Sequence, residues 1–250
     1  AGITTPPHAY IWREVVLLNS LPTMLRRRAA VLLVGITLLG FVSAIWQVRR
    51  TDQAMTGASP YLLIDPGHGG MDGGAVAADG TQEKTVNLAI SLPLADMLRV
   101  FGCTVRTTRD NDVSIHDAGA ATIKEKKVSD IHNRLALAQS ARLTVSIHQN
   151  QFPQTQYSGT QVFYSPNNPE SEGLADCIRE SVLTLLQPDN NRQLKKGGSS
   201  IYLLHHATPP AVLVECGFLS NPTEREKLKD AAYQQQMAFA IAGGVLRYAP

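Results

Sequence analysis

The stretch Tyr61–Gly70 (YLLIDPGHGG) constrains the fold most, because it joins a short apolar run to a sharp turn and a histidine. Residues Tyr61–Ile64 have the length and composition of a buried strand that turn residues stop. The glycines that follow let the chain reverse, since glycine tolerates a positive φ. His68 is then presented at the carboxyl edge of a strand, where open α/β sheets usually build binding sites. An ordinary turn histidine would give the same local pattern, so the rest of the chain must decide.

An amphipathic helix is predicted directly after the glycine-rich turn. Apolar residues recur at helical spacing over Glu83–Val100, and Phe101–Gly102 supply an end signal. The short run Cys103–Thr107 then predicts a second strand. A strand–helix–strand order implies a parallel pair with a right-handed crossover. We therefore expect an α/β fold, a single domain with a mostly parallel central sheet flanked by helices.

The alternation of short apolar runs and helical patterns continues to the end of the chain, apart from a polar surface excursion over residues 109–130 that is compatible with a short helix near its end. Further strands are expected at Leu143–Ile147, Gly159–Tyr164 and Ala211–Val214, and helices at Ser129–Ala141, Glu170–Leu186 and Gln234–Leu246, with a helix start at Asn221.

The N-terminal part has the pattern of a signal anchor. The uncharged run Ala29–Trp46 would form a helix of about 27 Å, near the thickness of a bilayer's hydrocarbon core. Three arginines, Arg26–Arg28, precede it, and a basic flank before an apolar run is typical of export signals. The run is longer than a usual signal peptide and Val42–Ala44 is a weak cleavage site, so an uncleaved anchor is favoured. The domain after residue 50 would then lie outside the cytoplasmic membrane.

These patterns divide the chain into four parts. We expect residues 1–23 to be an upstream extension that is not part of the working protein, 24–50 the signal anchor, 51–59 a small polar linker and 60–250 the catalytic domain. Residues 1–50 carry a net charge of +5, whereas residues 51–250 carry −3. The main domain thus has no nucleic-acid signature. Three cysteines, none in a CxxC pair, are too few for a disulfide framework and are expected to be small buried residues.

Three predicted strands each end in a residue that can bind metal or move protons: His68, His148 and Glu215. In a parallel sheet their carboxyl ends lie on one edge. Glu83 opens the helix after the first strand, and the amino ends of such helices point to the same edge. Independent turn residues would not be expected to converge in this way, so we expect a common site.

Two histidines and a carboxylate are a common catalytic zinc set, with the fourth position left to water. Zinc lowers the pKa of such a water towards ~7 and polarises a carbonyl, and the remaining carboxylate would act as general base. Spacing alone does not decide which glutamate, Glu83 or Glu215, is the ligand. Other histidines are weaker candidates. His205 and His206 are expected in a loop, His116 and His132 are expected to face solvent, and His8 lies in the upstream extension.

Residues from about 61 to 248 resemble the zinc-dependent N-acetylmuramoyl-L-alanine amidases of bacterial cell walls (amidase type 3 family). The likeness rests on four ordered motifs: LIDPGHGGMDGGAV, the Glu83–Lys84 pair that opens the next helix, VSIHQN, and VLVECGFLSNPTE. It implies that His68, Glu83 and His148 are zinc ligands and that Glu215 is the catalytic glutamate. It also implies a structural or substrate-orienting role for Arg134.

The resemblance implies hydrolysis of the amide between N-acetylmuramic acid and L-alanine in peptidoglycan. The short loop 165–171 leaves no room for the segment that blocks the site of cell-division amidases. The chain looks most like the spore-cortex, germination-specific amidases, in which stem-peptide removal belongs to cortex maturation. Some of these depend on a lipoprotein, which implies a lipoprotein activator here. A zinc peptidase acting within the stem peptide, and a non-catalytic wall-binding module, are the alternatives.

Overall fold

The computed structural model describes residues 61–248. The expected extension, signal anchor and linker lie outside these residues, so their assignment stays a prediction. Among the described helices, none is long and apolar enough to cross a membrane.

The elements are β1 (Leu62–Pro66), α3 (Glu83–Val100), β2 (Val105–Thr107), α4 (Ile123–Gln139), β3 (Leu143–Asn150), β4 (Gln161–Tyr164), α5 (Glu170–Leu185), β5 (Lys195–Lys196), α6 (Tyr202–His206), β6 (Ala211–Phe218), α7 (Pro222–Lys229) and α8 (Ala231–Tyr248).

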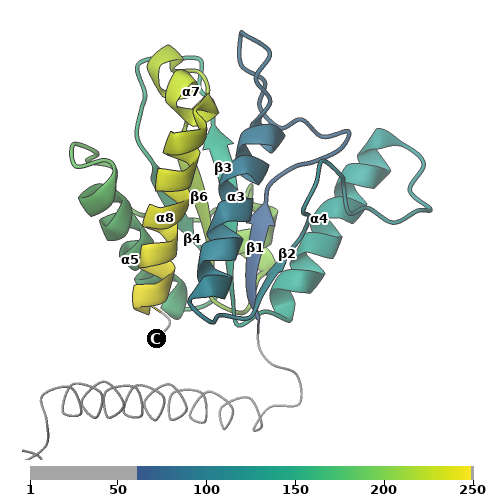
Figure 1. Ribbon diagram of the computed structural model, residues 1–250. Coiled ribbons are helices and arrows are strands. Elements are labelled where there is room, and N and C mark those ends of the chain that lie inside the picture. Colours follow the sequence, from purple (N-terminus) through teal and green to yellow (C-terminus); the bar gives the residue numbers. More distant parts are fainter. Residues whose placement is uncertain (1–60, 249–250) are drawn as a thin grey trace, which may run out of the picture. The chain divides into compact units, whose positions relative to one another are not determined.

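The strands form one six-stranded sheet in the order β2-β1-β3-β6-β4-β5. Strands β2, β1, β3 and β6 are mutually parallel, and β4 is antiparallel to β6. The expected α/β fold with a mostly parallel sheet is therefore confirmed for the described residues. The carboxyl ends of β1, β3 and β6 and the amino end of α3 lie at the top of the molecule in Figure 1, and we call this edge the catalytic rim.

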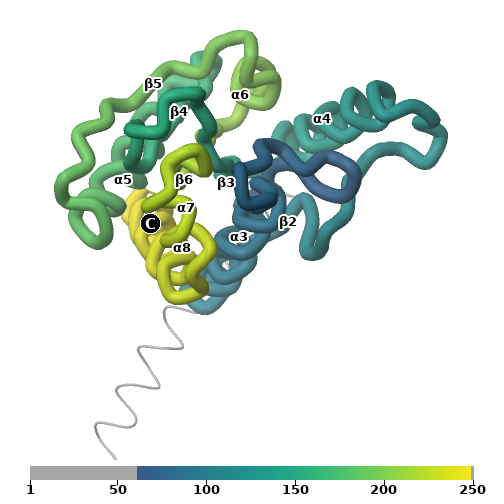
Figure 2. The backbone as a smooth tube through the Cα atoms, turned by 90° about the horizontal axis from the view of Figure 1, so that it is seen from above, coloured from purple at the N-terminus to yellow at the C-terminus, as the bar shows by residue number. Residues whose placement is uncertain are grey.

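Helices cover both faces of the sheet. Helices α3, α5 and α8 lie on one face, and α4 and α6 lie on the other (Figures 1 and 2). The larger apolar core lies under the first group and includes Ile90, Val145 and Val214. Smaller clusters around Leu63 and Leu213 lie under α4 and α6. Burial on both faces explains why the central strands read as continuous apolar runs rather than alternating ones.

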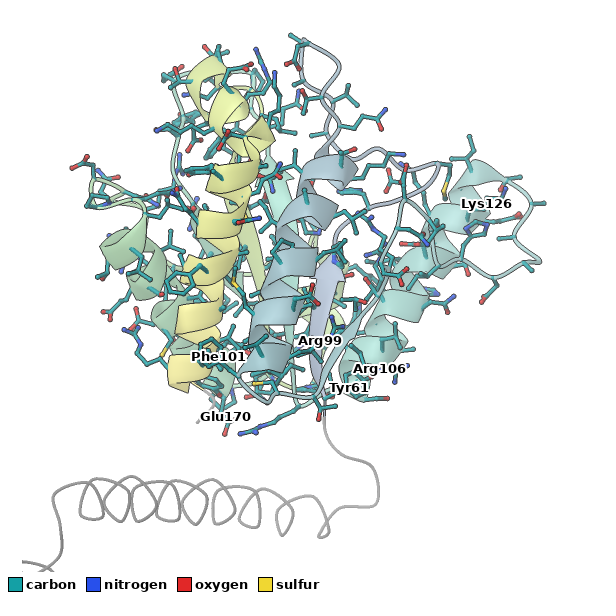
Figure 3. The ribbon with its side chains drawn as sticks, viewed as in Figure 1. Tyr61, Arg99, Phe101, Arg106, Lys126 and Glu170 are labelled. Atoms are coloured by element: carbon teal, nitrogen blue, oxygen red, sulfur yellow. The ribbon has the colours of Figure 1, made fainter. Side chains whose placement is uncertain are left out.

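Helix α4 begins earlier than the sequence pattern predicted. Ser129–Ala141 was expected, but the helix starts at Ile123, inside the polar excursion. Thr122 and Glu125 form a capping box, in which the Thr122 hydroxyl accepts from the Glu125 amide and the Glu125 carboxylate accepts from the Thr122 amide. The first turns project beyond the sheet, where Figure 3 labels Lys126. A cap rather than a buried apolar face therefore sets the start of this helix.

A close backbone contact joins α5 to α8. A Cβ atom built on Gly244 of α8 would lie 2.4 Å from the Cα of Ile178 and 2.7 Å from the carbonyl oxygen of Cys177, both on α5. Glycine is required here because the neighbouring atoms are backbone and cannot give way.

We predict that Gly244→Ala destabilises the domain by about 1–3 kcal/mol, because overpacking outweighs the helix propensity of alanine. The matched control is Gly173→Ala, also within a helix, where the nearest atom to a new Cβ is 3.6 Å away on Tyr248. This variant should gain about 0.5–1 kcal/mol. Urea unfolding of both variants measures the difference, and a Gly244→Ala protein as stable as wild type would refute the packing argument.

Candidate active site

The register of the sheet brings His148 and Glu215 together. They are direct partners across the parallel pair β3–β6. Neighbouring strands lie about 4.8 Å apart, and paired residues point to the same face. His148 lies on the same side of β3 as Thr144 and Ser146, and Glu215 lies on the same side of β6 as Leu213. This side of the sheet faces α4 and α6. Two residues 67 positions apart therefore share one place at the catalytic rim.

Gly67 makes room for the imidazole of His148. Strand β1 pairs with β3 up to Pro66 and Ile147, and the Gly67 amide donates to the Ile147 carbonyl at 3.0 Å. A Cβ on Gly67 would lie 2.3 Å from Cε1 and Nε2 of His148. A larger residue at position 67 would therefore displace the His148 ring. Glycine is needed here because the ring lies so close to the backbone, not because of the backbone conformation of the turn.

His68 has a φ of 61°, the one positive value among the described non-glycine residues. Such a backbone is sparsely populated and persists only when its surroundings hold it. Two arginines do so. Arg134 donates to the carbonyls of His68 (2.7 Å) and Pro66 (2.8 Å), and Arg109 donates to those of Pro66 (3.1 Å) and Gly67 (3.0 Å). The turn that presents His68 is thus fixed by buried guanidinium groups.

Arg134 in turn pairs with two carboxylates. It forms an ion pair with the buried Asp65 of β1 and another, at 2.6 Å, with Asp130 one turn earlier on α4. Burial alone would raise the pKa of Asp65, but Arg134 and the hydroxyls of Ser146 and Thr108 hold it below its usual range. Asp65 is therefore ionised, and the buried charges are compensated on both sides.

The Glu83 carboxylate lies between the two histidines. Its Oε1 is 2.9 Å from His148 Nδ1, and its Oε2 is 3.2 Å from His68 Nε2. The backbone amides of Gln149 (3.1 Å) and Ala75 (2.8 Å) also donate to it. Burial would raise the pKa of Glu83, but the two histidines hold it well below its usual range.

One ligand atom from each of His68, Glu83 and His148 lies within 4.8 Å of the others, and among the described residues this is the one such group of metal-binding side chains. The two imidazoles and the carboxylate converge from the turn after β1, from β3 and from the first residue of α3. The donor set fits a divalent transition metal, and zinc in particular.

Asp72 completes the surroundings of His68. Its carboxylate is 2.8 Å from His68 Nδ1, on the ring nitrogen opposite to the one that faces Glu83. Lys127 of α4 contacts the other oxygen of Asp72 at 2.8 Å. A carboxylate on the distal nitrogen fixes the orientation and tautomer of a ligating histidine. The part of α4 that the sequence pattern missed thus contributes to the site.

Glu215 contrasts with Glu83. Its Oε2 is buried and has no hydrogen-bond partner within the described part of the chain. Burial raises the pKa of Glu215 to about 7. The negative charge of Glu83 adds to this increase, whereas the two histidines oppose it. A carboxylate with a pKa near neutrality can both take up and release a proton at physiological pH.

The other candidate histidines within residues 61–248 are not part of this metal-binding group, and His8 lies outside the described residues. His205 and His206 are exposed in the short helix α6, not in the expected loop, and His132 is exposed on α4. Sequence reasoning missed Asp72 and Arg109. The signal for Asp72 was present in the GHGGMD motif, four residues after His68, but nothing local to Arg109 marks it, because it acts on carbonyls more than forty residues earlier.

A family model described as N-acetylmuramoyl-L-alanine amidase matches residues 62–247. The chain belongs to this family. Its activity is hydrolysis of the amide between N-acetylmuramic acid and L-alanine in peptidoglycan, and the rim that carries His68, Glu83, His148 and Glu215 is where the family motifs meet.

Similar proteins agree with this assignment. The germination-specific N-acetylmuramoyl-L-alanine amidase of Bacillus subtilis (strain 168) is 34% identical, over 84% of this chain and 92% of that protein. The solved structure of the CwlD amidase from Clostridioides difficile, in complex with the GerS lipoprotein, is 38% identical with a TM-score of 0.72, covering 76% of this chain and 98% of that one. An N-acetylmuramoyl-L-alanine amidase structure from Clostridium difficile 630 is 30% identical with a TM-score of 0.66, covering 76% and 97%.

We predict that zinc affinity increases with pH. Burial lowers the pKa of His68, but Asp72 and Glu83 outweigh burial and raise it to about 9 in the metal-free protein. Zinc must displace that proton. Affinity should therefore increase about tenfold per pH unit from pH 6 to 8 and level off above 9.

Competition with a chromophoric chelator at each pH measures this affinity. Asp72→Asn removes one of the charges that raise the pKa of His68, so the plateau should begin at lower pH. An affinity that does not change with pH would contradict the protonation of His68.

Proposed function

We propose that the chain is a zinc-dependent amidase in which His68, Glu83 and His148 hold the metal. The support is the convergence of three donor atoms, a buried anionic carboxylate between two imidazoles, and the Asp72 carboxylate behind His68. Bound there, zinc would supply a Lewis acid that polarises the scissile carbonyl and makes an attacking water more acidic.

Glu215 is the proposed general base and acid. Its unpaired buried oxygen lies beside the His148 position, and a pKa of about 7 suits both directions of proton transfer. Glu215 takes a proton from water as the water oxygen bonds to the lactyl carbonyl carbon. It returns this proton to the nitrogen of L-alanine as the C–N bond breaks. The products are the free lactyl carboxylate on the sugar and an intact stem peptide with a free amino terminus.

Arg134 acts through His68 in this proposal. Its side chain is 3% exposed, and its donors are taken by Asp65, Asp130 and the carbonyls of Pro66 and His68, so it is placed to hold the turn rather than to touch substrate. Of the two roles expected for this residue, the structural one has the support of these contacts.

The biological setting follows from the relatives. The germination-specific relative favours stem-peptide removal during spore-cortex maturation. The solved complex with a lipoprotein supports a lipoprotein activator for this chain as well. The Arg26–Arg28 cluster and the apolar run Ala29–Trp46 support a signal anchor that holds the catalytic domain outside the cytoplasmic membrane.

We predict that Glu215→Gln lowers kcat by at least about 100-fold while zinc content stays at the wild-type value and the unfolding midpoint does not fall, because the amide cannot exchange the proton and removes a buried unpaired carboxylate. Digests of purified cortex and vegetative peptidoglycan, with and without chelator, provide the activity. Mass spectrometry should find intact stem peptides in the wild-type digest.

Two outcomes would refute the proposal. Near wild-type turnover by Glu215→Gln would exclude this residue as the base. Shortened stem peptides in the wild-type digest would favour the peptidase alternative.

A further inference from the structure

Two exposed aromatic rings stand at the catalytic rim beside the site. Phe152 is 43% exposed and Tyr157 is 41% exposed, and their ring centroids are 5.6 Å apart. Both pack on the fully buried Phe218, at 5.5 and 6.2 Å. The guanidinium of Arg192 lies 4.5 Å from the Phe218 centroid and 5.9 Å from that of Tyr157. We call these four residues the aromatic platform.

The platform is connected to the reacting centre through two strands. Phe152 follows His148 by four residues, and Phe218 follows Glu215 by three on the paired strand. Three residues of extended chain span roughly 10 Å. Phe218 is the last residue of β6 and Phe152 lies two residues past the end of β3, so the platform is part of the catalytic rim.

Backbone and side-chain hydrogen bonds hold the platform in place. Arg192 Nε donates to the Ser158 carbonyl at 2.6 Å, and Asn221 donates to the Tyr157 carbonyl at 3.2 Å. The Phe152 amide donates to the Ser220 hydroxyl at 3.2 Å. Rings that are already fixed lose little conformational entropy when a ligand binds, so exposed rings supported from beneath are suited to recognition.

A polar pocket of about 390 Å³ opens immediately after Tyr157. Its lining includes the neutral side chains of Ser158, Asn191 and Thr223 and the charged side chains of Asp189, Glu224 and Lys227. Hydroxyl and amide groups of this kind match sugar hydroxyls and N-acetyl groups, which are neutral donors and acceptors.

We propose that Phe152 and Tyr157 form a stacking subsite for a sugar ring of the peptidoglycan glycan strand, next to the muramic acid whose amide is cleaved. This subsite rests on the peptidoglycan amidase function proposed above. The apolar face of the sugar lies on the rings, and its polar groups turn towards the adjoining pocket. The subsite makes the enzyme favour glycan chains over isolated muramyl peptides.

The test compares two substrates with the same stem peptide: a single N-acetylmuramoyl peptide and a glycan oligomer of several disaccharides. For the double variant Phe152→Ala/Tyr157→Ala we expect KM on the oligomer to rise about tenfold with kcat unchanged, the scale of lost aromatic contacts. On the single-sugar substrate both constants should stay at wild-type values. Zinc content and unfolding midpoint are measured alongside.

Matched variants separate ring stacking from folding. Phe152→Leu/Tyr157→Leu keeps apolar packing on Phe218 but has no flat face, so it should show the same KM increase on the oligomer. Phe101→Ala removes another exposed ring, 55% exposed, at the end of the domain opposite the catalytic rim, and should change neither KM (Figure 3).

Equal effects on both substrates, or none on either, would overturn the subsite, as would a wild-type KM in the leucine variant. If the wild-type protein hydrolyses neither substrate even with the proposed lipoprotein activator present, the amidase function fails instead, so the two failures are distinguishable.

Discussion

The site depends on one buried carboxylate that faces two imidazoles. Glu83 is 4% exposed, yet it is held in its charged form by His68, His148 and two backbone amides. A buried anion with cationic or metal partners is tolerable, whereas an unpaired one is costly. The chain must therefore bring β1, β3 and the start of α3 to the same point before the carboxylate can be buried. Folding and assembly of the metal-binding group are in this sense a single event.

The second glutamate has the opposite environment, and this difference is the basis of the roles that we propose for the two carboxylates. Glu83 accepts hydrogen bonds at both oxygens, which keeps it anionic and suits a ligand. Glu215 has a buried oxygen with no partner and a pKa raised to about 7, which suits proton transfer. Pairs of carboxylates whose environments push their pKa values apart often divide chemistry in this way. Rigid support comes from Arg134 and Arg109, which donate hydrogen bonds to the carbonyls of His68 and Gly67 and so fix the backbone of this turn.

Much of this could be predicted from the sequence because the central strands are buried on both faces. Runs such as LTVSI and AVLV read directly as strands, and the residues that end them fall on the rim by topology. The start of α4 was missed because the prediction followed apolar periodicity, whereas the signal at that point is the capping-box pattern Thr122-x-x-Glu125. The contact of Lys127 with Asp72 depends on that extra helix. Phe152 and Tyr157 lie in an irregular segment, where no periodic pattern indicates which side chains meet.

Zinc-edge anomalous diffraction from metal-loaded crystals of the protein tests the central claim most directly. The account predicts one strong peak about 2.0–2.2 Å from one atom each of His68, Glu83 and His148, with Glu215 beyond ligand distance. A peak bound through Glu215 in place of Glu83, or an ion held away from these three residues, would contradict it.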